Sequence, residues 1–188
     1  MLLYLVMAFW AAIGWAFNAR LASMTARAIA PTGAMFTFLA LWTGALWGRP
    51  TWGTWWVWDA RLTSELILLF LYAGFLSLVS AIDDPRRADR AGALLAIVGS
   101  INVPIIYFSV KWWNTLHQGA TISATAAPKM ASTMLTAMLL MTLAFWAYAF
   151  AVVFTRARAI VLERDRHAGW AQASARPARS ATATGMQT

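Results

Sequence analysis

The sequence contains no cysteine among its 188 residues. Disulfide bonds, Fe–S clusters, thiolate metal sites and covalent attachment of a cofactor through this chain's own thiols are therefore excluded. Charged residues are also scarce, at 12%, whereas 61% of residues are hydrophobic and the mean hydropathy is +0.59. A soluble domain of this size does not need so much apolar surface in its core, so the lipid bilayer is the predicted solvent.

Apolar runs of near-spanning length recur along the chain. A helix that crosses the roughly 30 Å hydrocarbon layer needs about 20 largely apolar residues. The runs are Leu2–Phe17, Ile29–Leu46, Leu66–Ile82, Ala91–Val110 and Met134–Phe154. The sequence therefore predicts an all-α, polytopic membrane helix bundle with five transmembrane helices, which forms one domain over residues 1–155.

Acidic residues are few, at 7 against 15 Lys and Arg, and the net charge is +8. The basic residues cluster at the ends of the apolar runs and form no stripe among polar side chains, which argues against nucleic acid as a partner. Counted on alternate sides of the membrane, 11 lie on one side and 4 on the other. The positive-inside rule places the richer side in the cytoplasm. The amino terminus and the connections 47–65 and 111–133 are then predicted to be external.

The two ends of the chain differ in character. Met1 opens directly into an apolar run without a basic leader, so we expect the first helix to stay in the membrane and not to be cleaved as a signal peptide. Residues 156–188 are predicted to be a basic cytoplasmic tail, largely disordered beyond its first turns, because they are poor in large apolar groups. His167 lies in this tail beside Arg166 and is predicted to be solvated.

Tryptophan is plentiful and unevenly placed. Of the twelve tryptophans, five lie within fifteen residues of one external connection: Trp47, Trp52, Trp55, Trp56 and Trp58. An aromatic belt scatters one or two indoles at each helix end. If residues 51–61 form a short helix in the interface plane, positions i, i+3, i+4 and i+7 share one face. These positions are occupied by Trp52, Trp55, Trp56 and Asp59. Such a broad aromatic face suits a planar macrocycle such as haem.

Charged residues flank this tryptophan-rich segment. Arg49, Arg61 and Lys111 are the external cations available for haem propionates, and anchoring of the topology is their alternative role. Asp59 directly precedes the third span, where a carboxylate at a helix amino terminus is favourable. Capping is therefore favoured over ligand contact as the role of Asp59.

The chain has only two histidines. Haem iron commonly takes an imidazole as an axial ligand. His117 lies in an external connection just after Trp112 and Trp113, on the same predicted side of the membrane as the tryptophan-rich segment. His117 is therefore the predicted ligand of the iron.

Long stretches of the sequence resemble a known family. They are WGTWWVWDARLTSELILLFLY at 52–72, NVPIIYFSVKWWNTLHQGATI at 102–122 and APTGAMFTFLALWTGALWG at 30–48. The chain resembles the heme exporter protein C family, the haem-handling membrane proteins of System I cytochrome c biogenesis that carry a tryptophan-rich WWD motif. The similarity runs over nearly the whole chain except the tail.

The resemblance implies a multi-pass protein of the bacterial inner membrane that holds haem b transiently and non-covalently at the periplasmic face. It implies delivery of that haem to a membrane-anchored haem chaperone of the CcmE type. The implied partners also include ATP-binding-cassette transporter subunits of the CcmA and CcmB types and a small membrane subunit of the CcmD type. The family's haem platform maps to Trp52, Trp55, Trp56, Trp58 and Asp59, and its axial histidine after the WWNTL word maps to His117.

The sequence departs from the family in one respect. The resemblance implies a further amino-terminal span and a second external histidine ahead of the first apolar run, and this sequence contains neither. We expect a start site assigned too far downstream, or a truncated gene, in preference to a shorter natural variant with one histidine ligand.

Other classes of function are less well supported. A permease subunit of a membrane transporter is the alternative, but transporters usually place ionisable groups or broken helices near the midplane. The spans here are nearly free of charge, with Asn102 and Pro104 as the main irregularity. No Ser–His–Asp set, metal-spaced cluster or phosphate loop is recognisable in the sequence, so we do not expect the chain to be an enzyme.

Overall fold

The computed structural model describes residues 1–113, 115, 117 and 130–164. These residues form six α-helices and no strand. The helices are α1 (Leu2–Ala16), α2 (Arg20–Trp52), α3 (Ala60–Ala81), α4 (Pro85–Gly99), α5 (Asn102–Trp112) and α6 (Ser132–Arg164).

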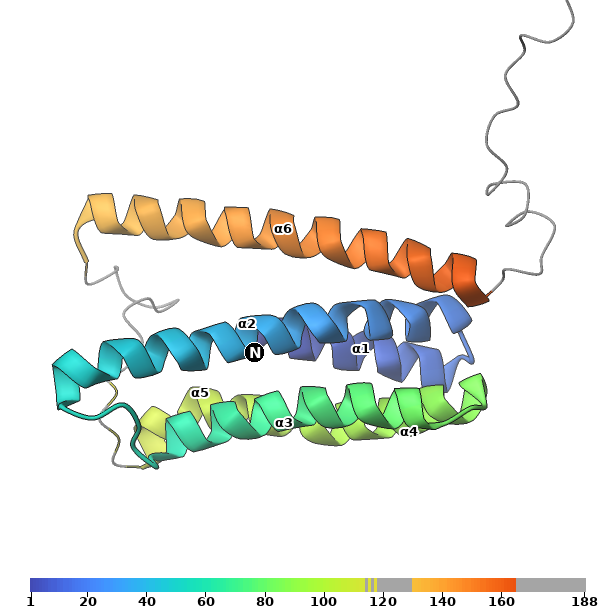
Figure 1. The fold of residues 1–188 in the computed structure, drawn as a ribbon, viewed down its shortest axis with the longest axis horizontal. Helices are drawn as coiled ribbons and strands as arrows, with labels where there is room; N and C mark the ends of the chain where they lie inside the picture. The colour runs from blue at the N-terminus through green and yellow to red at the C-terminus, as the bar shows by residue number, and fades with distance from the viewer. Residues whose placement is uncertain (114, 116, 118–129, 165–188) are drawn as a thin grey trace, which may run out of the picture.

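The helices form an antiparallel bundle in which α2 lies between α6 and the other helices (Figure 1). Helix α1 packs against α2 and α4, and α3 packs against α2, α4 and α5. By length and composition four stretches can cross a membrane: α2, α3, the α4–α5 pair taken as one 28-residue span, and α6. Helix α1 is equally apolar but has 15 residues, about 22 Å of helix. The chain is therefore a polytopic helical membrane bundle, as the sequence predicts.

The apolar runs mark the embedded part of each helix and not its ends. Helix α2 begins at Arg20, whereas the second apolar run begins at Ile29, so the predicted connection over residues 18–28 is mostly helical. Peptide groups leaving the hydrocarbon must still be hydrogen-bonded, and continuing the helix achieves this whether side chains are apolar or basic. The actual turn is short and contains Asn18 at a φ of 50°, a left-handed conformation that asparagine tolerates.

The fourth span is broken near its middle. Helix α4 ends at Gly99 and α5 begins at Asn102. Between them the backbone hydrogen bonds span three residues, as in a tighter turn; the N–H of Ile101, for example, donates to the backbone oxygen of Val98 at 3.2 Å. Pro104 has no N–H to donate to the preceding turn, which accounts for the break. The side-chain amide of Asn102 donates to the backbone oxygen of Ser64 in α3 at 2.8 Å. The side chain of Asn102, at the helix break, therefore links α5 to α3 by a hydrogen bond.

The core lies where α1, α2, α3 and α4 meet. Tyr4 and Tyr72 are fully buried there and make an edge-to-face contact with ring centroids 4.9 Å apart. Each tyrosine ring faces a glycine of another helix: Gly99 faces Tyr4 and Gly33 faces Tyr72. Small residues that allow such close approach are the usual means of packing helices in lipid.

The basic end of the bundle is held by one acidic side chain. Asp89 of α4 forms ion pairs with Arg27 of α2 and Arg164 of α6, both at 2.9 Å. At the same end, Asp84 accepts hydrogen bonds from the backbone N–H groups of Arg86 and Arg87 and so caps α4. These backbone donors, Arg87 first, hold the pKa of the Asp84 carboxyl below its ordinary value.

The last helix reaches beyond the predicted span. Helix α6 continues through Arg164 and so includes residues 156–164, which the sequence assigns to the tail. Residues 165–188, and with them His167, lie outside the described residues.

Candidate functional site

The tryptophan-rich segment joins α2 to α3 at the end of the bundle opposite the turn between α3 and α4 (Figure 1). The predicted interfacial helix over residues 51–61 is wrong. Helix α2 runs to Trp52 and ends at Gly53, whose φ of 78° is left-handed, and α3 starts only after Asp59. The glycine as a helix terminator and the aspartate as an amino-terminal cap together override the i, i+3, i+4 spacing.

Local hydrogen bonds shape this connection. Arg49 donates from its guanidinium to the backbone oxygen of Gly53 at 2.7 Å. The hydroxyl of Thr54 donates to the backbone oxygen of Trp56 at 3.1 Å. Asp59 Oδ1 accepts from the backbone N–H of Leu62 at 2.8 Å, which confirms the predicted cap on α3.

The indoles are arranged as two edge-to-face pairs rather than along one helix face. Trp47 and Trp52 have ring centroids 5.3 Å apart, and Trp56 and Trp58 are 5.4 Å apart. Trp55 is 54% exposed and Trp58 is 75% exposed. Trp47, which is not among the site residues predicted from the sequence, is therefore in contact with Trp52.

His117 lies against this segment although the two are far apart in sequence. Its Nδ1 is 2.8 Å from Asp59 Oδ2, and its ring is 4.8 Å from that of Trp52 in an edge-to-face contact. The backbone N–H of His117 donates to the hydroxyl of Thr115 at 3.0 Å. The imidazole is thus held by Asp59 and Trp52, its backbone is held by Thr115, and its side chain keeps 21% of its surface exposed.

The candidate cations have different neighbours. The Arg49 guanidinium stands over the Trp55 ring, 5.9 Å from its centroid, whereas Lys111 stands 5.8 Å from the ring of Phe108. Arg61 occupies the first turn of α3. Among the three, the structure brings Arg49 into contact with the tryptophan-rich segment.

The site has the groups that a flat, carboxylate-bearing metal macrocycle needs. Trp55 and Trp58 present exposed rings for stacking. The indole N–H of Trp56 is buried and has no hydrogen-bond partner among the described residues, so an incoming carboxylate could accept from it. With Nδ1 held by Asp59, the second imidazole nitrogen, Nε2, is the one available to a metal. In the described part of the chain no group of three or more His, Cys, Asp or Glu side chains lies together.

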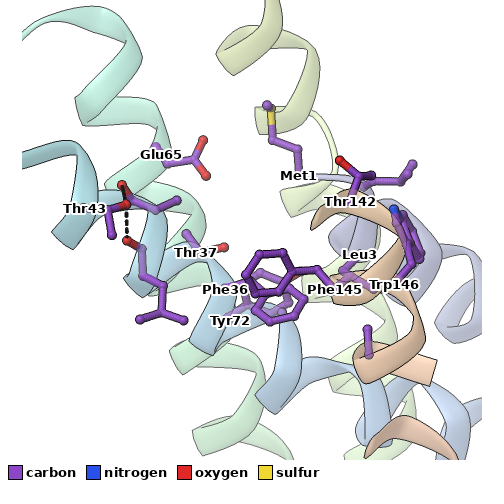
Figure 2. A pocket seen from close by; sticks show the side chains of 15 residues that line it. Met1, Leu3, Phe36, Thr37, Thr43, Glu65, Tyr72, Thr142, Phe145 and Trp146 are labelled. Carbon is purple, nitrogen blue, oxygen red and sulfur yellow. Dashed lines mark hydrogen bonds between the residues drawn. The ribbon is translucent and has the colours of Figure 1, made fainter. Parts of the chain in front are cut away.

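A separate cavity of about 700 Å³ lies within the spans, lined by parts of α1, α2, α3 and α6 (Figure 2). Its walls are largely apolar, with Phe36 facing Phe145 at a centroid distance of 5.6 Å. Glu65, Thr37 and Thr43 supply polar groups on the α2 and α3 side. The sequence analysis missed this cavity because its lining residues resemble ordinary lipid-facing positions.

Comparison with known proteins decides the family. The family model described as heme exporter protein C matches residues 1–172. The chain belongs to the heme exporter protein C family.

The heme exporter protein C of Escherichia coli strain K12 is 57% identical over 119 residues, which cover 63% of this chain and 49% of that protein. Its counterpart in Bradyrhizobium diazoefficiens is 57% identical over 125 residues, or 66% of this chain and 48% of that protein. The one in Haemophilus influenzae is 46% identical over 169 residues, or 90% of this chain and 69% of that protein.

This chain spans about half the length of the first two of these heme exporter C proteins. The family model covers both the tryptophan-rich segment and His117. Membership of the heme exporter protein C family therefore confirms the resemblance drawn from the sequence words.

Proposed function

We propose that this chain binds haem at the membrane surface formed by the tryptophan-rich segment and His117. The observation that carries the proposal is the contact of His117 with both Trp52 and Asp59, from a segment more than fifty residues away. An imidazole fixed beside exposed indole rings combines a metal ligand with a stacking platform. The printed name of the relatives, heme exporter protein C, supports haem as the ligand.

The proposed roles follow from the geometry. His117 would ligate the iron through Nε2, while Trp55 and Trp58 would stack on the porphyrin. Trp56 and Arg49 would bind the propionates through the buried indole N–H and the guanidinium. Arg61 and Lys111 would contribute longer-range attraction from α3 and α5. When bound, haem b supplies the iron and the redox chemistry, and this chain's residues bind, orient and release it.

The wider role that we propose is that of a carrier. The bound haem would be held at the periplasmic face of the bacterial inner membrane and passed to a membrane-anchored haem chaperone of the CcmE type. Subunits of the CcmA, CcmB and CcmD types would work beside it. The opposite placement of the Asp89 ion pairs and the tryptophan-rich segment supports this orientation, because the positive-inside rule assigns the basic end to the cytoplasm.

Replacement of the predicted ligand tests the proposal. We expect His117→Ala to lower the haem content of the detergent-purified protein at least tenfold, because the only iron ligand that we assign is lost. Absorbance of the reduced pyridine complex of haem measures that content. The matched control is His167→Ala, which removes the chain's other histidine and should leave haem content unchanged. Equal haem content in His117→Ala and the unmodified protein would refute the ligand role.

A further inference from the structure

Asp59 uses its two carboxylate oxygens for different tasks. Oδ1 accepts from the backbone N–H of Leu62, 2.8 Å away, at the start of α3. Oδ2 lies 2.8 Å from Nδ1 of His117. The side chain is only 5% exposed, so it is not a surface carboxylate that meets the histidine by chance. The bond to α3 fixes the direction in which the second oxygen points.

The chemistry of the pair determines the state of the imidazole. An ionised carboxylate only accepts hydrogen bonds, so Nδ1 of His117 carries the proton that they share. In a neutral imidazole the lone pair then lies on Nε2, and a nitrogen with a free lone pair is what a metal binds. Carboxylates placed behind metal-binding histidines in this way orient the ring and make the ligand more basic.

We propose that Asp59 is a positioning residue that sets the tautomer of His117 and directs Nε2 toward the haem iron. The inference rests on the proposed function and deepens it. Asp59 acts through His117, because its buried carboxylate has both oxygens occupied and is not presented to a ligand. The proposed haem ligand is thereby fixed to the amino-terminal cap of α3 as well as to its own connection. A carboxylate behind a ligating imidazole favours ferric over ferrous iron, so the pair would lower the reduction potential of haem held there.

The test distinguishes the role of Asp59 as a helix cap from its contact with His117. Asp59→Ser keeps a good helix cap but is too short to reach His117, whereas Asp59→Asn keeps both reach and cap but removes the charge. Asp84→Ser is the matched control, since Asp84 caps α4 in the same way at the other end of the bundle. A His167→Gln background leaves His117 as the only histidine in the sequence.

Two measurements are made on the full chain in detergent. Nitrogen-15 NMR of histidine-labelled, haem-free protein reports which ring nitrogen carries the proton. We expect the proton on Nδ1 in the parent protein and loss of that preference in Asp59→Ser. Titration with haem then gives the affinity, and a redox titration of the haem-loaded protein gives the reduction potential. Asp59→Ser should bind haem about 10- to 100-fold more weakly, and both Asp59 variants should raise the potential, whereas Asp84→Ser should change neither quantity.

The outcomes distinguish this inference from the proposed function. If His117→Ala binds haem like the parent protein, the proposed function fails and this inference fails with it. If His117→Ala loses haem but Asp59→Ser retains the parent tautomer, affinity and potential, then only the positioning role is overturned. Asp59 would in that case be a helix cap alone, a role that serine keeps, so Asp59→Ser and Asp84→Ser would both leave thermal stability near that of the parent protein.

Discussion

Individual side chains at the tryptophan-rich end differ in how fully their polar atoms are satisfied. The carboxylate of Asp59 has a partner for each oxygen, and the backbone N–H of His117 is bonded to Thr115. The indole N–H of Trp56, by contrast, is buried without a partner among the described residues. Leaving a buried donor unpaired costs free energy, and a ligand oxygen that accepts from Trp56 would recover that cost.

This donor gives a prediction for Trp56→Phe, which keeps an aromatic ring and removes the N–H. We expect haem to bind about tenfold more weakly, because a hydrogen bond to a charged carboxylate contributes roughly 1.5 kcal/mol. Titration of the purified protein with haem measures the change. Trp15→Phe is the control, since Trp15 is 51% exposed on α1, away from the site. Equal affinities for both variants would assign Trp56 to an aromatic belt.

Among the helices, close packing depends on glycines at particular positions. A Cβ added at Gly33 of α2 would meet the ring and hydroxyl of Tyr72 in α3, whereas one added at Gly44 would meet nothing within 4 Å. Both glycines lie in the same helix, α2. Their sequence surroundings give no sign of the difference, which arises only from what the neighbouring helix presents.

We therefore expect opposite effects from the same substitution in α2. Gly33→Ala should destabilise the bundle by about 1 to 3 kcal/mol, because the fully buried Tyr72 cannot move away. Gly44→Ala should be neutral or stabilising by up to about 1 kcal/mol, since alanine is the better helix former. Thermal unfolding in detergent compares the two variants. Equal melting temperatures would contradict the packing of Tyr72 on Gly33.

For the bundle as a whole, the position of α6 depends on few interactions. Helix α6 packs chiefly on α2, and its carboxyl end is joined to α4 by the Arg164–Asp89 ion pair at 2.9 Å. The same aspartate binds Arg27 of α2, so three helices meet at one carboxylate. Ion pairs of this kind lose most when one partner is removed, because the remaining charges are left uncompensated.

Asp89→Asn is expected to loosen α6. The two arginines would then face each other without a countercharge, and we expect a loss of about 2 kcal/mol in stability. Spin labels on cysteines introduced at Arg90 and Ala159 report the α4–α6 distance, and the natural absence of cysteine makes the labelling specific. The distance distribution should broaden in Asp89→Asn and stay narrow in Asp83→Asn, which alters an exposed carboxylate nearby. An unchanged distribution in Asp89→Asn would show that α2 alone holds α6.

Several features could be predicted from the amino-acid order because they depend on local chemistry. Apolar runs locate the spans, since the bilayer penalises charge at every position within them. The cap at Asp59 and the helix break before Pro104 are equally local, because each depends on backbone groups a few residues away. The interfacial helix expected over residues 51–61 does not form, because Gly53 adopts a left-handed conformation that ends α2 and the i, i+3, i+4 spacing does not reveal such a terminator.

The amino-acid sequence, then, was sufficient for the membrane class, the approximate spans and the residue types of the candidate site. Only the folded chain decided which of these residues meet. The pairing of Asp59 with His117, the contact of Trp52 with the same imidazole and the meeting of three helices at Asp89 all join residues from different helices or connections. No local pattern encodes such pairs, because they depend on how long helices pack side by side and which ends that packing brings together.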